Sequence, residues 1–452
     1  ASSGVGTTQY RTSTNGGAWT SPSTGTSVTV SAEGETLVEF RATDVAGNVG
    51  AWTRSASGGS GSVRIDRSAP TGTPVLTGAT GAWSSAASAT VTAAGSSDAG
   101  SGIAGLQSRT SANGGGTWSS PAAGSSVTTS AEGETLVQFC GLDNVGNAGA
   151  WSTATSGGTG SVRLDRTAPA APTTSGGSTS WVNAASTTLT ASGGADAGSG
   201  TVGYQWASST DAGSTWGTSQ AGGSTAVPAE GETLVRFRSV DAVGNTSAWA
   251  TPATVRLDRG NPTVSASGAT GTWTNAATVT VTATSADSVS SVAATDHRTS
   301  TDGGTSWSTP ATGASVPVTA EGVTLVQFRA TDAAGNASAW TAATVGGSGS
   351  VRIDRTAPGV SQSGADGAWS AASSVTVTSS SSDGASGVAG TQYRTSDDLG
   401  NTWGATTAGS VTSVSREGTT LAVFRATDNA GNTSAWTSAT GGSPGSGPLA
   451  RT

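Results

Sequence analysis

Several residue types are missing or rare in this chain of 452 residues. All 20 basic residues are Arg, Met is absent, and there is one Cys and one His. Without Lys, the chain cannot form Lys–Asn or Lys–Asp isopeptide cross-links. Cys140 is alone, so no intrachain disulfide forms. His297 stands where other repeats carry an aromatic residue, and a catalytic triad needs a His, so the sequence predicts no enzyme.

Charge and apolar residues are also sparse. Charged residues make up 11% of the chain, the net charge is −8 and the pI is about 4.7. A weakly acidic surface excludes nucleic acid as a partner, because nucleic acid needs basic patches. No apolar run approaches the ~20 residues of a membrane-spanning helix, so no membrane span is predicted. Hydrophobic residues are 34% of the total, which leaves each folded unit a thin core.

One motif, Asp-x-x-Gly-Asn, is written into the chain five times. It begins at Asp44, Asp143, Asp241, Asp332 and Asp428, at intervals of 91 to 99 residues. A Trp follows each of these Asp residues eight positions later, and all five Phe occupy one position of the repeat. Such a period indicates a tandem array of whole domains. In the motif itself, Asp and Asn accept local backbone hydrogen bonds and Gly tolerates a positive φ, which predicts a tight turn.

Each repeat has the pattern of short strands separated by turns. Segments such as 89–92 and 279–282 alternate with a period of two, and no helical pattern of useful length appears. In the strongest strand, Val137 and Phe139 are predicted to face the core, with Leu136 and Gln138 on the opposite face, because both faces cannot be equally buried. The predicted fold is all-β: a linear tandem array of immunoglobulin-like β sandwiches of about 95 residues each.

A junction signal, Arg-x-Asp-Arg followed by Pro, divides the array. The predicted units are 1–66, 67–165, 166–258, 259–354 and 355–452. The first unit begins at a point that aligns with the middle of the others, so it is expected to lack its first strands. Short linkers with Pro favour an extended chain, since Pro restricts φ and biases its predecessor to extended conformations.

The hairpin 297–307, the strand 325–331 and the Asp-x-x-Gly-Asn turn that follows resemble bacterial immunoglobulin-like, fibronectin-type-like tandem repeats of large secreted surface proteins and adhesins. The resemblance covers essentially the whole chain. It implies the sandwich fold and an extracellular role as a stalk, spacer or filament body. It is specific for fold and weak for function, because such sandwiches carry many roles.

Carboxylates are predicted to converge at four junctions between units, because the sandwich topology places their loops at one pole. Hard oxygen ligands from several loops suit Ca²⁺, which takes 6–8 oxygens. The alternative is neutralisation by the Arg that follows each linker Asp. The predicted calcium sets are Glu33, Asp66, Asp98 and Asp143; Glu132, Asp165, Asp196 and Asp241; Glu230, Asp258, Asp287 and Asp332; and Glu321, Asp354, Asp383 and Asp428.

Two further features each have two interpretations. The 15 Trp could stack against sugars, but they are expected to supply core bulk that Ala, Ser and Gly cannot. Asn245, Asn336 and Asn432 begin Asn-x-Ser sequons, which fit either glycosylation or turn chemistry.

The sequence therefore predicts a non-enzymatic, extracellular structural repeat protein that forms a stalk, fibre or filament on the bacterial cell surface. Its expected partners are further copies of itself or other surface proteins. One alternative is an adhesive array that binds glycans or a host surface. Another is a virion-attached fibre, which the sequence does not separate from a cell-surface one.

Overall fold

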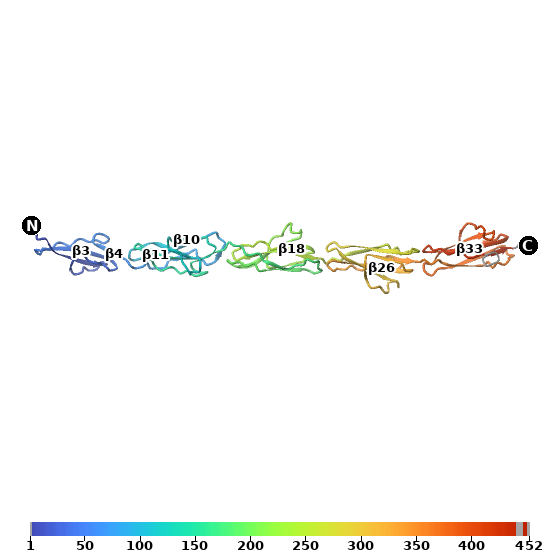
Figure 1. The fold of residues 1–452 in the computed structure, drawn as a ribbon, viewed down its shortest axis with the longest axis horizontal. Coiled ribbons are helices and arrows are strands. Elements are labelled where there is room, and N and C mark those ends of the chain that lie inside the picture. Colours follow the sequence, from blue (N-terminus) through green and yellow to red (C-terminus); the bar gives the residue numbers. More distant parts are fainter. Residues whose placement is uncertain (1, 440–445, 450–452) are drawn as a thin grey trace.

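The computed structural model describes residues 2–439 and 446–449. Residue 1 of the first predicted unit and residues 440–445 and 450–452 of the fifth lie outside the described residues. All regular structure in the described ranges is β strand. Figure 1 shows the units end to end in one row, with the two termini at opposite ends. No helix in the described part of the chain is long and apolar enough to span a membrane.

The first unit forms one four-stranded sheet in the order β2-β1-β3-β4. Its strands are β1 (Val5–Thr14), β2 (Ser23–Thr24), β3 (Gly34–Asp44) and β4 (Ser62–Ile65). Phe40 on β3 is only half-buried, whereas the matching Phe of every later unit is fully buried. The difference follows from the single sheet, since the later units place a second sheet over this face.

The second and fourth units are sandwiches of a three-stranded and a five-stranded sheet. In the second unit the three-stranded sheet is β10-β7-β5, from β5 (Val75–Thr77), β7 (Ala89–Ala94) and β10 (Ser126–Thr129). The other sheet is β6-β12-β11-β8-β9, from β6 (Trp83–Ser84), β8 (Ile103–Ser111), β9 (Ala122–Ala123), β11 (Gly133–Asp143) and β12 (Ser161–Leu164).

The fourth unit repeats this arrangement. Its three-stranded sheet, β20-β22-β25, is made of β20 (Thr263–Ser267), β22 (Val279–Ala286) and β25 (Ser315–Val318). Its five-stranded sheet, β21-β27-β26-β23-β24, is made of β21 (Trp273–Thr274), β23 (Val292–Ser300), β24 (Ala311–Thr312), β26 (Gly322–Asp332) and β27 (Ser350–Ile353). In both units the first segment joins the two sheets: β5 and β20 belong to the smaller sheet, and β6 and β21 to the larger.

The third and fifth units pair a three-stranded with a four-stranded sheet. The third contains β13 (Thr173–Gly176), β14 (Thr187–Ser192), β15 (Thr201–Ser209), β16 (Gln220–Ala221), β17 (Ser224–Val227), β18 (Gly231–Asp241) and β19 (Ala253–Leu257). The fifth contains β28 (Gly359–Ser363), β29 (Val375–Ser382), β30 (Val388–Ser396), β31 (Thr407–Ala408), β32 (Val411–Val414), β33 (Gly418–Asp428) and β34 (Ser446–Leu449). The sheet orders are β13-β14-β17 with β16-β15-β18-β19, and β28-β29-β32 with β31-β30-β33-β34.

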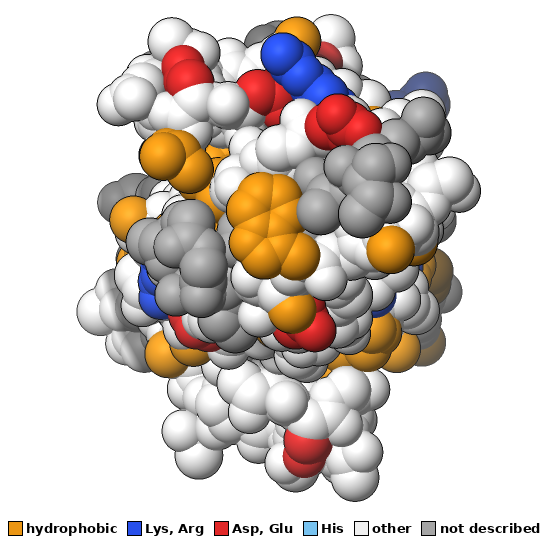
Figure 2. Space-filling view, turned by 90° about the vertical axis from the view of Figure 1, so that its right-hand side faces the viewer, with side chains coloured by type: hydrophobic (Ala, Val, Ile, Leu, Met, Phe, Trp, Pro, Cys, Tyr) orange, Lys and Arg blue, Asp and Glu red, His pale blue; other side chains and the backbone are white. Residues whose placement is uncertain are grey.

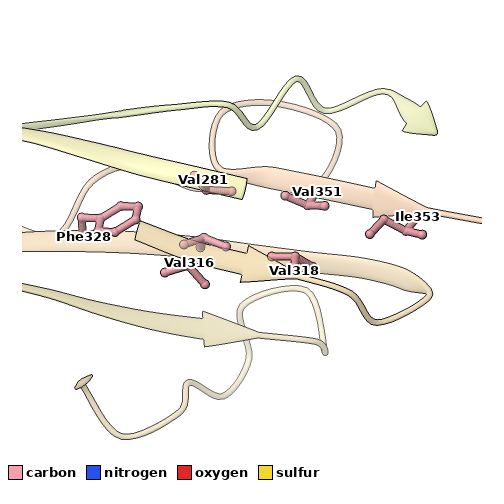
Figure 3. Packing of buried hydrophobic residues seen from close by; sticks show 7 residues of the cluster. Val281, Val316, Val318, Phe328, Val351 and Ile353 are labelled. Atoms are coloured by element: carbon pink, nitrogen blue, oxygen red, sulfur yellow. The ribbon is translucent and has the colours of Figure 1, made fainter. Parts of the chain in front are cut away.

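A small hydrophobic core lies between the two sheets of each complete unit. In the fourth unit, Phe328 of β26 and Val281 of β22 point into the same space as the side chains of β25 and β27 (Figure 3). Phe139, Phe237, Phe328 and Phe424 are each 0% exposed, which confirms the prediction that Phe is a core residue. A Phe ring buries ~150–250 Å², so one ring supplies much of a core otherwise made of Val, Leu, Ile and Ala.

The opposite face of the same strand is also covered at the Leu position, so the expectation that both faces cannot be equally buried was wrong there. Leu136 is 2% exposed, and Leu325 and Leu421 are each 1% exposed. The reason is the hairpin loop, which folds back over the sheet: Leu325 packs beneath Gly304 and close to Trp307. Gly304 has a φ of 94°, a conformation that favours glycine.

Candidate junction sites

The Asp-x-x-Gly-Asn turn is held together by its own side chains. In the third unit, Asp241 Oδ1 accepts the amide hydrogens of Val243 and Asn245. Asn245 Nδ2 in turn donates to Asp241 Oδ2 at 2.7 Å, and Gly244 has a φ of 94°. The local chemistry therefore orients the Asn side chain along with the turn.

The same Asn also reaches back to the linker that precedes its unit. Its Nδ2 donates to the main-chain carbonyl of the linker Asp, some 80 residues earlier. The four pairs are Asn147 with Asp66 at 3.2 Å, Asn245 with Asp165 at 3.1 Å, Asn336 with Asp258 at 3.0 Å and Asn432 with Asp354 at 2.8 Å. We refer to this contact as the Asn clamp. It occupies the glycosylation nitrogen of all three sequons, so the folded junctions favour the turn interpretation over glycosylation.

Three of the four carboxylates predicted for each junction come together. One carboxylate oxygen from each Asp lies within 4.8 Å of the others. These Asp clusters are Asp66, Asp98 and Asp143; Asp165, Asp196 and Asp241; Asp258, Asp287 and Asp332; and Asp354, Asp383 and Asp428. In each cluster the first Asp is the linker residue and the third opens the turn. The sequence thus placed these twelve residues correctly, although whether they bind an ion stays a prediction.

The linker Asp is bound from the following unit through its side chain as well. Asp165 Oδ2 accepts the amide hydrogen of Ser199 at 2.6 Å, and Asp258 and Asp354 make the same contact with Ser290 and Ser386. Asp165 is 1% exposed and Asp258 is 0% exposed. A buried carboxylate needs such donors, because burial without hydrogen bonds is costly.

The predicted Glu of each set lies outside the Asp cluster, which corrects the four-carboxylate sets. Glu132 pairs with Arg166 at 2.8 Å and also accepts the backbone amide hydrogen of that Arg. Glu230 pairs with Arg259, and Glu321 with Arg355, each at 3.2 Å. At the first junction, Glu33 accepts the amide hydrogens of Arg67 and Ser68. Glu belongs to the loop of the preceding unit and is engaged there by the linker Arg and its neighbours.

At the second, third and fourth junctions, the Arg side chains therefore neutralise the Glu and not the Asp residues. Within the described ranges, no Arg forms an ion pair with a member of an Asp cluster. Burial raises the pKa of Asp143, but hydrogen bonds from Asn147 and from the amides of the turn outweigh burial and lower that pKa. Burial likewise opposes ionisation of Asp165, and hydrogen bonds from Ser199 and Thr167 lower its pKa below the ordinary value. Hydrogen bonds from side chains and backbone amides thus favour the charged form of both carboxylates.

The Trp residues of the hairpin and of the last strand region lie outside the core, so their expected role as core bulk was wrong. They form ladders with Arg on the outer face of the larger sheet. In the fourth unit, the Arg298 guanidinium lies 4.7 Å from the ring centroid of Trp307 and 4.4 Å from that of Trp340, and Arg329 lies 4.9 Å from Trp340. Such cation–π contacts occupy ring surface that a sugar would need.

His297 faces the core and not the Trp ladder. Its ring lies 6.2 Å from the Phe328 ring, and Nδ1 contacts the carbonyl oxygen of Gly313 at 3.1 Å. Tyr393 has the matching position against Phe424 in the fifth unit. Seen along the rod from its C-terminal end, charged side chains are few, and backbone, uncharged side chains and scattered hydrophobic side chains make up most of the described surface (Figure 2).

Four complete units each have two facing sheets and a shared core, and in the second, third and fourth the first segment also pairs with the last strand. This arrangement decides the architecture. The chain is an array of immunoglobulin-like sandwiches.

Comparisons with known proteins add little to this assignment. No family model and no curated protein matches the array. A solved tetra-tandem repeat from the extending region of a large adhesion protein matches at 19% identity and a TM-score of 0.31, over 81% of this chain and 100% of that one. The FN1–FN3 domains of chicken CNTN1 match at 14% identity and a TM-score of 0.24, over 61% of this chain and 99% of that one. Fibronectin(III)-like modules of Clostridium thermocellum CbhA match at 16% identity and a TM-score of 0.21, over 37% of this chain and 90% of that one. With TM-scores this low, the sheet order of the array itself decides the fold.

Proposed function

We propose that the array is a non-enzymatic, extracellular spacer that holds its two ends far apart. The observation that carries this proposal is the double attachment of the linker Asp at the second, third and fourth junctions. Asp165 donates its amide hydrogen to Ser84 of the preceding unit at 2.9 Å, while its carbonyl and carboxylate are bound by Asn245 and Ser199 of the following unit. A linker bonded on both sides leaves little freedom for one unit to swing against the next.

Calcium is the ligand that best fits the Asp clusters. The backbone hydrogen bonds accepted by Asp98, Asp196, Asp287 and Asp383 all end on Oδ2, so Oδ1 is left for another partner. Ca²⁺ takes carboxylate oxygens at about 2.3–2.6 Å, so two ligand oxygens of one ion lie up to about 5 Å apart. The 4.8 Å limit within each Asp cluster supports this fit. A bound ion would remove the repulsion between the carboxylates and fasten three loops at each junction.

Calorimetric titration of the full chain with calcium tests this proposal. We expect one ion for each of the four Asp clusters. Asp196→Asn should remove one binding event and leave the other three. The matched control is Asp211→Asn in the hairpin of the same unit, whose carboxylate bonds only to Ser209 and Thr215 and which should leave calcium binding unchanged. A chain that gives no heat, and no calcium by elemental analysis after dialysis, would refute the calcium sites.

A further inference from the structure

In the second, third and fourth units, the entry segment that follows the first strand pairs in parallel with the last strand. In the second unit, β6 runs beside β12, with Trp83 opposite Arg163 and Ser84 opposite Leu164. In the fourth unit, β21 runs beside β27, with Trp273 opposite Arg352. The third unit has the same relationship as a single parallel bridge between Val182 and Leu257. All other strand pairs of these three units are antiparallel.

This pairing determines how a unit would carry tension. The chain enters the second unit through β5 and then β6 and leaves it through β12, and the two termini lie at opposite ends of the array (Figure 1). Tension on the two ends therefore slides one parallel strand along the other. The evenly spaced bonds of a parallel pair then bear the load together. In an antiparallel hairpin pulled open at one end, the bonds break one after another.

The bonds of this parallel pair continue to the junction. In the second unit the amide of Gly81 donates to Ser161 at 3.0 Å, and the amide of Asp165 donates to Ser84 at 2.9 Å. In the fourth unit Gly271 donates to Ser350 at 3.0 Å, and Asp354 donates to Thr274 at 2.9 Å. The linker Asp is thus the last bonded residue of the parallel pair and also the residue that the Asn clamp holds.

In the second, third and fourth units, the linker Arg fastens the exit of the unit to its entry segment. Arg166 Nη1 donates to the carbonyl oxygens of Ala86 and Ala87, just after β6, at 3.1 and 3.0 Å, and Nη2 donates to Ser130 at 2.9 Å. Its ion pair with Glu132 adds a fourth attachment. Arg259 and Arg355 repeat this with Ala184 and Ala185, and with Ala277, respectively. We call these three residues the Arg staples.

We propose that the array bears tension along its length, and that the parallel strand pair with its Arg staple is the element of the second, third and fourth units that resists force. This role goes beyond spacing, because a spacer need only be long. It does not depend on calcium, since the Arg staples pair with Glu and backbone carbonyls rather than with the Asp clusters.

Single-molecule pulling of the full chain from its two ends tests the proposal. The triple variant Arg166→Gln, Arg259→Gln and Arg355→Gln removes the three Arg staples. The matched control, Arg109→Gln, Arg236→Gln and Arg298→Gln, removes one guanidinium from the Trp ladder of each of the same units. Loss of the staple bonds should raise the unfolding rate of three units about tenfold at equal load, as expected for one or two net hydrogen bonds. The unfolding force of each variant is compared with its equilibrium free energy of unfolding.

Two results would overturn the load-bearing role. One is equal unfolding forces in the staple variant and the unchanged chain. The other is an equal fall in force for the staple and ladder variants when their equilibrium stabilities match. If the staple variant does not fold, the chain with its Arg staples intact is pulled in a second geometry. The handles are then attached at Ser214→Cys and Ala229→Cys, which lie beyond the paired ends of β15 and β18. The third unit should then unfold at lower force than in end-to-end pulling, and an equal or higher force would contradict the proposal.

Discussion

The side-chain amide of Asn245 donates a 3.1 Å hydrogen bond to the main-chain carbonyl of Asp165, 80 residues earlier in the chain. One residue of a tight turn thereby fixes the start of its own unit against the end of the previous one. The same pair recurs at each of the four junctions, so one kind of contact holds every junction of the array.

Removal of this contact should loosen one junction. Asn245→Ala deletes bonds to Asp165, Thr167 and Asp241 and should lower the free energy of unfolding of the third unit by about 1–3 kcal/mol. Spin labels at Thr128→Cys and Ala226→Cys should report a broader distance distribution between the second and third units. Asn113→Ala, whose bonds stay within one hairpin, is the control. An unchanged distribution for Asn245→Ala would show that the Asn clamp does not set the junction.

The Phe position should dominate the stability of each complete unit. Phe328→Ala should cost about 3–5 kcal/mol, because the ring is fully buried and the small residues around it cannot refill its space. The loss should stay mainly within the fourth unit, as in other linear arrays. Val345→Ala, at a position that is 51% exposed, should change little. Urea unfolding with unit-resolved hydrogen exchange measures both, and a cost well below ~3 kcal/mol would contradict the core assignment.

A side-chain exchange between units tests one local difference. In the fifth unit, Gln362 Oε1 accepts the hydroxyl hydrogen of Thr437, and Nε2 donates to Ser438. The fourth unit has Ala266 at this position, and a cavity of about 310 Å³ lies beside Ala266 and Thr341. Ala266→Gln should stabilise the fourth unit by about 1 kcal/mol, and Gln362→Ala should destabilise the fifth by a similar amount. Ala226→Gln, at an exposed strand position, should leave the stability of its unit unchanged. Denaturant titration measures the free energy of unfolding of the three variants.

Acid should remove the contribution of Glu134. Burial opposes its ionisation, but hydrogen bonds from Ser161, Ser156, Gly157 and Arg163 lower its pKa from 4.5 to about 2. A lowered pKa in the folded state means that the stabilisation is fully present above pH 4.5 and is lost as pH falls through about 2. Urea unfolding should therefore show the unchanged chain more stable than Glu134→Gln at pH 6, with the difference shrinking in acid. Val323 fills this position in the fourth unit, which should show no such pH dependence. A stability difference that persists at pH values near 2 would contradict this account.

The sequence predicted the fold and the Asp clusters because both follow from local rules applied to a repeat. Alternating Thr and Val mark strands, and the turn chemistry of Asp44 to Asn48 is repeated five times. Once the fold is known to be a sandwich, the loops that carry Asp165, Asp196 and Asp241 must meet at one pole. Glu132 comes from the neighbouring unit, and its position in the sequence does not show that it pairs with Arg166 instead of joining the Asp cluster.

The Asn clamp and the Trp ladders were missed for different reasons. The Asn clamp joins residues about 80 positions apart, and the tight turn alone is enough to explain why an Asn stands there. The signal that could have indicated the clamp is that every repeat keeps Asn beside the turn Gly. The ladders were missed because Trp was treated as core bulk. Arg298 and Arg329 share the repeat with Trp307 and Trp340, but only the pleat of the sheet places their side chains on one outer face.

Small-angle X-ray scattering of the full chain, in calcium and in chelator, tests the central claim of a rod held at its junctions. In calcium the account predicts an elongated particle with a maximum dimension on the order of 150–190 Å, from units of ~35–40 Å. In chelator the mean end-to-end distance should shorten while the circular dichroism of the strands stays the same. Unchanged scattering on chelation would contradict calcium as the junction ligand. A compact particle in both solutions would contradict the rod itself.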